Sequence, residues 1–435
     1  MFVLKGKYSK DCKVYAETIE DSALKQIYGM LESPAFNGIK VRMMPDCHAG
    51  ANCCIGTSYP IGEFVDPCHV GVDIGCCLTS IKLSDELPIE KYVDFEHKVR
   101  NRVPTGFNIH EHSVIDEKDF YKYLNKVYST VRSGWPDMIN EIGRIDEKYI
   151  TELCRRVNMD LGTFYKSIGT LGSGNHFLEL GMSDSGDTYF TIHCGSRNFG
   201  VKVCNYWAKI VKNEKISKEA INSINELIKT TEPDKRKWKE LIDKAKLAYK
   251  ERRPAGYLYG ENLKGYLSDM VICQAYASYN HDTIVRIVED ILKTYRIKIV
   301  DKIRSVHNYI DFKDHILRKG AIRAYEGEKM IIPFNMRDGL AICNGKSNDD
   351  WNCTAPHGAG RIMSRAAARK NVDVEEFRKS MEGIYSTCIG TGTLDESPMV
   401  YKNTDEIIKL IKPTVEILEF VKPKINIKAT DTMEE

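Results

Sequence analysis

The stretch Tyr189-Phe190-Thr191-Ile192-His193-Cys194-Gly195-Ser196-Arg197-Asn198-Phe199-Gly200 joins an alternating apolar run to a loop of small and polar residues. The run predicts a short β-strand, and His193 stands where that strand should end. Other β-prone runs precede similar segments, namely Ile39–Met44 before Pro45-Asp46, Val70–Ile74 before Gly75-Cys76 and Met330–Ile332 before Pro333. Because chemistry commonly sits on loops held by a rigid sheet, we expect these strand ends to converge on one cleft.

A helical segment is expected between the strand-rich parts of the chain. Lys212–Arg253 carries thirteen Lys/Arg against eight Asp/Glu, and its apolar residues recur at helical spacing on both sides of Pro233. This spacing predicts a helical hairpin, and a third helix should follow from about Leu263 to Leu292. A last helix should begin near Thr404-Asp405 and end before Pro413.

Together these patterns predict an α+β fold. We expect a single unit of mixed sheets over residues 1–435, with the helical segment at about 205–292 packed at its side. No internal repeat and no Gly/Ser-rich or Pro-rich linker marks a domain boundary.

Composition excludes several classes of protein. The 435 residues are 42% apolar and 29% charged, a globular balance that excludes a disordered, collagen-like or coiled-coil chain. No stretch approaches the roughly 20 consecutive apolar residues of a membrane span, and the first residues do not resemble a secretion signal. We therefore expect a cytoplasmic protein.

Charge and cysteine content exclude further classes of protein. The net charge of only +2 argues against a protein that coats nucleic acid through bulk charge, although a local basic groove remains compatible with it. The 14 cysteines are too few for a disulfide scaffold of this length. In the cytoplasm we expect most of them to be reduced thiols.

A set of nitrogen, oxygen and sulfur donors points to metal chemistry. Asp73-Ile74-Gly75-Cys76 places a carboxylate and a thiol three residues apart, and alone it is better explained by an Asp that hydrogen-bonds its own turn beside a buried Cys. His176, His193 and His307 each have small or polar neighbours. Each histidine alone could be structural, but the five residues together could bind a pair of transition-metal ions that share the thiolate.

The segment from Asn352 to Arg361 contains His357-Gly358-Ala359-Gly360-Arg361. Small residues let backbone N–H groups approach a phosphate, arginine neutralises it, and a neutral imidazole can act as a nucleophile. The alternative is a glycine turn that opens a helix over Arg361–Lys370, with His357 as its cap. The spacing alone does not separate the two interpretations.

Several blocks together resemble the RtcB family of RNA-splicing and repair ligases. They run in order through nearly the whole chain: Met44-Pro45-Asp46-Cys47-His48-Ala49-Gly50, Gly71-Val72-Asp73-Ile74-Gly75-Cys76, Gly169–Glu179, His193-Cys194-Gly195-Ser196-Arg197, Val306-His307-Asn308, Arg318-Lys319-Gly320-Ala321 and His357-Gly358-Ala359-Gly360-Arg361. The combination is far more specific than any single block.

The resemblance implies a GTP- and Mn²⁺-dependent ligase that joins an RNA end carrying a 2′,3′-cyclic phosphate or 3′-phosphate to a 5′-hydroxyl end. By resemblance, Asp73, Cys76 and His176 would bind one Mn²⁺, and Cys76, His193 and His307 the second. His357 would become guanylylated. The residues that would line the guanylate site are Asn175, Phe177, Glu179, Asn308, Tyr401 and Lys428.

Two features limit how far the resemblance reaches. Phe334-Asn335 stands where many members of the family have Gly-Ser, which puts the phosphate contacts there in doubt, and the donor set by itself favours zinc over manganese. Two alternatives stay open: a metal-dependent cyclic phosphodiesterase that does not ligate, and a non-catalytic paralogue that binds RNA ends. RNA contacts are expected from local basic groups such as Arg197, Arg318, Lys319, Arg361 and Arg365, with contact to the triphosphate of GTP as the alternative role for some of them.

Overall fold

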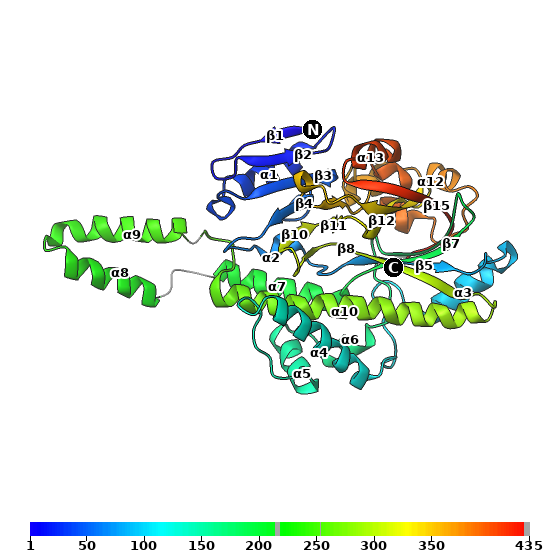
Figure 1. Ribbon diagram of the computed structural model, residues 1–435, viewed down its shortest axis with the longest axis horizontal. Helices are drawn as coiled ribbons and strands as arrows, with labels where there is room; N and C mark the ends of the chain where they lie inside the picture. The colour runs from blue at the N-terminus through cyan, green and yellow to red at the C-terminus, as the bar shows by residue number, and fades with distance from the viewer. Residues whose placement is uncertain (214–217, 253, 430–435) are drawn as a thin grey trace.

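The computed structural model describes residues 1–213, 218–252 and 254–429. In these residues two large sheets lie over a long helix, as Figure 1 shows. The described helices are α1 (Asp21–Leu31), α2 (Pro67–Val70), α3 (Tyr92–Arg102), α4 (Glu117–Gly134), α5 (Glu147–Arg156), α6 (Leu161–Lys166), α7 (Arg197–Asn213), α8 (Lys218–Thr231), α9 (Trp238–Arg252), α10 (Gly260–Lys293), α11 (Arg365–Asn371), α12 (Val374–Ser380) and α13 (Thr404–Ile411). The α+β prediction is confirmed.

The larger sheet has seven strands, and all of its strand pairs are antiparallel. In spatial order they are β12 (Lys329–Asn335), β13 (Gly339–Gly345), β15 (Val415–Ile427), β6 (Phe177–Ser183), β7 (Thr188–Cys194), β5 (Cys77–Leu83) and β8 (Ile299–Val306). Residues at paired positions of neighbouring strands present their side chains to the same face of the sheet. Phe177 is paired with His193 and Glu179 with Asn426, so one face of the sheet gathers these side chains.

The second sheet has six strands and contains one parallel pair, β2 with β3. Its strands in spatial order are β1 (Phe2–Leu4), β2 (Asp11–Val14), β3 (Lys40–His48), β4 (Ile55–Pro60), β10 (Ile316–Lys319) and β9 (Tyr309–Ile310). A two-stranded sheet of β11 (Ala321–Arg323) and β14 (Thr354–Pro356) continues from β10 and ends just before His357.

The long helix α10 is apolar on most of its circumference because it packs against structure on several sides. Its first half, including Tyr266 and Met270, belongs to the large core that α4, α6 and α7 share. Its second half, including Ile284 and Ile291, packs with α3 against the seven-stranded sheet. A helix that is apolar all round is expected in such a buried position.

The expected helices are found, with one difference in placement, but the part before them that we expected to be rich in strands also contains the four helices α3 to α6. The predicted third helix is α10, and the predicted hairpin is formed by α8 and α9. Helices α7 and α10 pack beside the sheets as expected, whereas the α8–α9 hairpin projects away from them at the left of Figure 1. Among the described residues, no helix is both long enough and apolar enough to cross a bilayer.

One predicted strand is wrong. Val70–Ile74 is the end of the short helix α2 followed by a loop, and the strand begins only at Cys77. Asp66 caps α2 and Pro67 occupies its first turn, which favours helix over strand. Gly71 and Gly75 then have φ angles of 98° and 75°, and this left-handed backbone is incompatible with a strand. Asp73 and Cys76 therefore lie in the loop before a strand, not after one.

Candidate active site

A cavity of about 570 Å³ lies over the face of the seven-stranded sheet that carries Phe177 and Glu179. Its other walls come from the ends of β3 and β12 and from the segment that begins at His357. The predicted site residues that line it are Asn175, Phe177, Glu179, His193, His357, Tyr401 and Lys428. These residues are far apart in the chain, so the expected convergence of loops on one cleft is found.

The predicted metal ligands meet at one side of this cavity. The Cys76 Sγ atom is 3.5 Å from His176 Nε2 and 3.4 Å from His193 Nε2. The His193 Nε2 atom is 3.3 Å from His307 Nε2, and His176 Nε2 is 3.1 Å from Asp73 Oδ2. Cys76 thus stands between two groups of donors, which is the position that a bridging thiolate would occupy. Cys76, His176 and His193 form the one His/Cys/Asp/Glu cluster within the described ranges whose ligand atoms approach each other closely enough to bind a metal ion.

Neighbouring backbone groups hold the carboxylate and one imidazole of this cluster. Ser196 donates its backbone N–H to Asp73 Oδ1 at 2.9 Å. A Cβ atom on Gly195 would lie 2.1 Å from the same oxygen, so only glycine lets this backbone approach Asp73. The His193 Nδ1–H donates to the carbonyl of Asn175 at 3.1 Å. This bond fixes the tautomer and leaves the lone pair of Nε2 directed at Cys76 and His307.

Protonation states agree with a cation site. Burial lowers the pKa of His193 and of His307 well below the usual value, so both rings are neutral and can donate a lone pair. Burial raises the pKa of the Cys76 thiol, and a cation is what would stabilise a thiolate there. Although burial acts in the opposite direction, the hydrogen bond between Asp73 and His176 lowers the pKa of the acid and raises that of the histidine. His193 and His307 therefore fit a divalent metal ion as they stand, and His176 and Asp73 fit one when the ion replaces the proton between them.

His357 stands at the end of β14, with one ring nitrogen held and the other available. Its Nδ1–H donates to Asp46 Oδ2 at 2.7 Å, and Asp46 itself is fully buried. The bond leaves the lone pair on Nε2, which is the nitrogen needed for nucleophilic attack. The structure does not support a cap role for His357, because α11 begins at Arg365 and Ser364 caps it.

Asp46 is a functional candidate that the sequence reasoning did not single out. It lies within β3, 311 residues from His357, so only the fold brings the two together. The available signal was its place in the block Met44–Gly50. His48 was also missed: it lines the cavity, its Nδ1–H donates to the carbonyl of Asp46, and burial lowers its pKa to about 4.

The imidazoles of the site form a continuous row. Ring centroids are 5.2 Å apart between His176 and His193, 5.2 Å between His193 and His307, and 5.0 Å between His307 and His357. The candidate nucleophile is therefore next to the candidate metal ligands, so one bound phosphate could contact both.

Another part of the cavity lining carries Glu179, Tyr401 and Lys428. Burial raises the pKa of Glu179 to about 8, against the opposing effects of Asn426 and Lys428. The Lys428 Nζ atom lies 5.7 Å from the centre of the Phe177 ring and donates to the His176 carbonyl at 3.3 Å. The Tyr401 hydroxyl donates to Glu396 at 2.9 Å. Asn308 is not among the described residues that line the cavity; its Oδ1 accepts from the Gly320 N–H at 2.8 Å.

Comparison with known proteins agrees with this geometry. A sequence profile described as tRNA-splicing ligase RtcB matches residues 30–429. The chain belongs to the RtcB family. It is 27% identical over 417 residues to the RNA-splicing ligase RtcB of Escherichia coli K12, with 90% of each chain covered. It is 25% identical over 453 residues to the tRNA-splicing ligase RtcB of Aeropyrum pernix, with 91% of this chain and 90% of the other covered.

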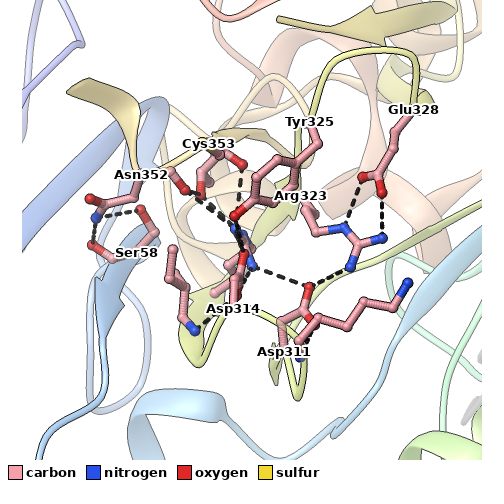
Figure 2. Close-up of polar contacts among 12 residues, drawn as sticks. Ser58, Asp311, Asp314, Arg323, Tyr325, Glu328, Asn352 and Cys353 are labelled. Carbon is pink, nitrogen blue, oxygen red and sulfur yellow. Dashed lines mark hydrogen bonds and ion pairs between the residues drawn. The ribbon is translucent and has the colours of Figure 1, made fainter. Parts of the chain in front are cut away.

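Two of the basic residues that lie in the RtcB-like blocks have structural contacts. Arg318 is fully buried and bonds to Asp314 at 2.6 Å, so it cannot contact RNA as predicted. Figure 2 shows the surrounding ion-pair network, in which Asp311 also faces Arg323. Lys319 donates to the Val70 carbonyl at 3.2 Å. A buried charge requires such partners, and here the loop before β10 and the end of α2 supply them.

The other three arginines, unlike Arg318, lie at the cavity or close to the candidate metal ligands. Arg361 and Arg365 line the cavity and are held by Asp395 and Glu396. Arg197 donates to Thr170 and to the Gly106 carbonyl beside the metal cluster. The fourteen cysteines are all free in the structure, as the composition predicts, and Cys76 is the one that belongs to a candidate metal cluster within the described chain.

Proposed function

We propose that this RtcB-family protein joins an RNA end with a 2′,3′-cyclic phosphate or 3′-phosphate to a 5′-hydroxyl RNA end, with GTP as co-substrate and through a histidine-bound GMP. The observation that carries the proposal is the position of His357. Its Nδ1 is bound to buried Asp46, its ring adjoins His307 of the metal cluster, and it lines the same cavity as Glu179.

The first step would be guanylylation of the enzyme. The free Nε2 of His357 attacks the α-phosphorus of GTP, a P–N bond forms, and the bond to the β-phosphate breaks with release of pyrophosphate. Asp46 stabilises the positive charge that develops on the imidazole, because its carboxylate accepts a hydrogen bond from the Nδ1–H. The resulting P–N bond is labile, so the guanylyl group can be passed on.

The next steps would transfer GMP to the RNA and then release it. An oxygen of the RNA 3′-phosphate attacks the phosphorus of the adduct and restores free His357; a cyclic phosphate is first opened by water. The 5′-hydroxyl oxygen of the second RNA end then attacks the activated 3′-phosphate, and GMP leaves. A phosphate monoester is a poor electrophile because of its charge, and capping with GMP provides a leaving group.

Two Mn²⁺ ions are proposed for the cluster around Cys76. Asp73, Cys76 and His176 would hold one, and Cys76, His193 and His307 the other, and the donor types on both sides of the thiol support this division. Divalent ions bound there would neutralise phosphate charge and orient the attacking oxygen. Manganese itself is proposed by family resemblance, since the donors alone favour zinc.

The guanine base is proposed to bind at Glu179. A carboxylate accepts two hydrogen bonds from the N1–H and amino group of guanine, and adenine cannot provide this pair. Phe177 offers a ring face, and Tyr401 and Lys428 close the pocket. The tyrosine and lysine are tied to Glu396, which keeps both in place without blocking Glu179.

The test is incubation of the protein with GTP labelled at the α-phosphate and Mn²⁺. We expect an acid-labile protein–GMP adduct in the wild type and none with His357→Ala. A wild type that forms no adduct yet opens cyclic phosphates would be a phosphodiesterase. A protein that binds RNA ends but forms no adduct and opens no cyclic phosphate would be a non-catalytic paralogue.

A further inference from the structure

Asn426 faces the proposed guanine pocket with one hydrogen-bonding atom unused. It lies on β15 directly opposite Glu179 on β6, and both line the cavity. Its Nδ2 donates to Glu179 Oε2 at 2.9 Å, while its Oδ1 has no hydrogen-bond partner among the described residues. The residue is only 1% exposed, so water does not readily compensate for the missing bond.

The orientation of this amide follows from its neighbours. The ionised carboxylate that would bind guanine only accepts hydrogen bonds, so in that form the NH₂ group points at Glu179 and the oxygen points elsewhere. The backbone of Asn426 is also fixed: its N–H donates to the Tyr385 carbonyl at 3.0 Å, and its carbonyl accepts from Ser386 Oγ at 2.7 Å. Asn426 Oδ1 is therefore a preorganised acceptor beside the carboxylate.

A buried acceptor without a partner is costly, and a bound ligand can supply the missing donor. Guanine has three N–H bonds on its Watson–Crick edge, one on N1 and two on the exocyclic N2. Glu179 has two carboxylate oxygens and can accept the N1–H and one N2–H. The second N2–H then needs an acceptor near Glu179 Oε2, and Asn426, which is bonded to that oxygen through Nδ2, is the neighbouring side chain with an unused acceptor.

We propose that Asn426 is a specificity-determining residue whose Oδ1 accepts a hydrogen bond from the exocyclic amino group of guanine. The inference rests on the proposed guanylate site and deepens it. This hydrogen bond would distinguish guanine from hypoxanthine, which has the N1–H and lacks the amino group. Because Glu179 already accepts one N2–H, the bond to Asn426 is possible only when N2 carries two hydrogens.

The experiment measures the dissociation constants of GMP and IMP by calorimetry, with Mn²⁺ present. Monophosphates have no pyrophosphate to lose, so no adduct forms and binding alone is observed. In Asn426→Leu we expect the ratio of the IMP to the GMP dissociation constant to fall by about 2- to 12-fold, the range of one hydrogen bond. Asn344→Leu makes the same change on β13 of the same sheet outside the cavity lining, and should leave the ratio unchanged.

A purely structural Asn426 gives a different result. If it acted only by holding Glu179 in place, Asn426→Leu would leave the ratio unchanged when it is made in a Glu179→Gln background, and the inference would be overturned. If wild type bound neither nucleotide, the proposed guanylate site would fail as well, so the two failures are distinguishable.

A second measurement needs no variant and so does not depend on the stability of one. N2-methyl-GMP keeps one N2–H and replaces the other with a methyl group. We expect wild type to bind it at least about tenfold more weakly than GMP, because the methyl displaces the hydrogen bond to Asn426 Oδ1. Equal affinity for both nucleotides would overturn the inference. In Asn426→Ala, which makes room for the methyl, this discrimination should fall.

Discussion

Substitution of Asp46 by asparagine tests whether this carboxylate sets the reactivity of His357. Asp46 is fully buried, its Oδ2 accepts the His357 Nδ1–H at 2.7 Å, and it does not line the cavity. The change from carboxylate to amide keeps the size of the side chain. It removes the charge and allows an NH₂ group to face the ring.

The expected loss follows from this single contact. Hydrogen bonds to charged groups contribute about 1.5–3 kcal/mol, which is roughly 10- to 150-fold in rate if the bond strengthens as the imidazole becomes positive. If the amide NH₂ faces the ring, Nδ1 must accept, the proton moves to Nε2, and the nucleophilic lone pair is lost. The same substitution at the aspartate of serine proteases costs about 10⁴-fold. We expect Asp46→Asn to slow adduct formation by about 10² to 10⁴.

The assay follows formation of the labelled protein–GMP adduct at saturating GTP, with the GMP dissociation constant measured separately. Because Asp46 does not line the cavity, the rate should fall while GMP affinity stays within about twofold of wild type. Asp269→Asn is the matched control. Asp269 is equally buried but bonds to Arg156 and Trp207 in the helical part, so its substitution should lower stability and leave the adduct rate of the folded protein unchanged.

One result would refute the reasoning. If folded Asp46→Asn formed the adduct within about threefold of the wild-type rate, the hydrogen bond at Nδ1 would not control the nucleophile. A fall in GMP affinity as large as the fall in rate would likewise show that Asp46 acts on binding.

Three further predictions address the metal cluster, the base pocket and the buried ion pairs. Cys76→Ala should lose most of the bound Mn²⁺ per chain, measured by elemental analysis, with the melting temperature of the metal-free protein little changed; full retention of two ions would exclude a bridging thiolate. GMP affinity should rise as the pH increases through about 8, because burial raises the pKa of Glu179 to about 8 and guanine needs the ionised form; calorimetry should show this dependence disappear in Glu179→Gln, and a flat wild-type profile would argue against Glu179 as the base contact. Arg318→Met should lower the free energy of unfolding by about 3–5 kcal/mol in urea titrations, because it leaves the largely buried Asp314 without its cation, whereas Asp311 keeps Arg323; a loss below about 1 kcal/mol would show that the network contributes little.

Helices were predictable because their signals are local. The periodic apolar residues on both sides of Pro233 and along Leu263–Leu292 predicted α8, α9 and α10 within a few residues. The projection of the α8–α9 hairpin was not predictable, because side-chain periodicity does not specify which surface an apolar stripe meets. The short β-prone run at Val70–Ile74 was misleading, because Pro67 and two glycines with positive φ outweigh strand propensity there.

The sequence alone determined which chemical groups are present and that they belong together as a family pattern. Asp73, Cys76 and three histidines were recognisable as candidate metal donors from residue type, and His357 as a candidate nucleophile from its small neighbours. Only the tertiary structure decided which groups touch. Asp46 reaches His357 across 311 residues and Asn426 reaches Glu179 across 247, while Arg318 bonds to buried acids and not to a substrate. Residue type sets the chemistry available to a side chain, but strand pairing and burial choose its partner and thereby its tautomer, pKa and access to ligand.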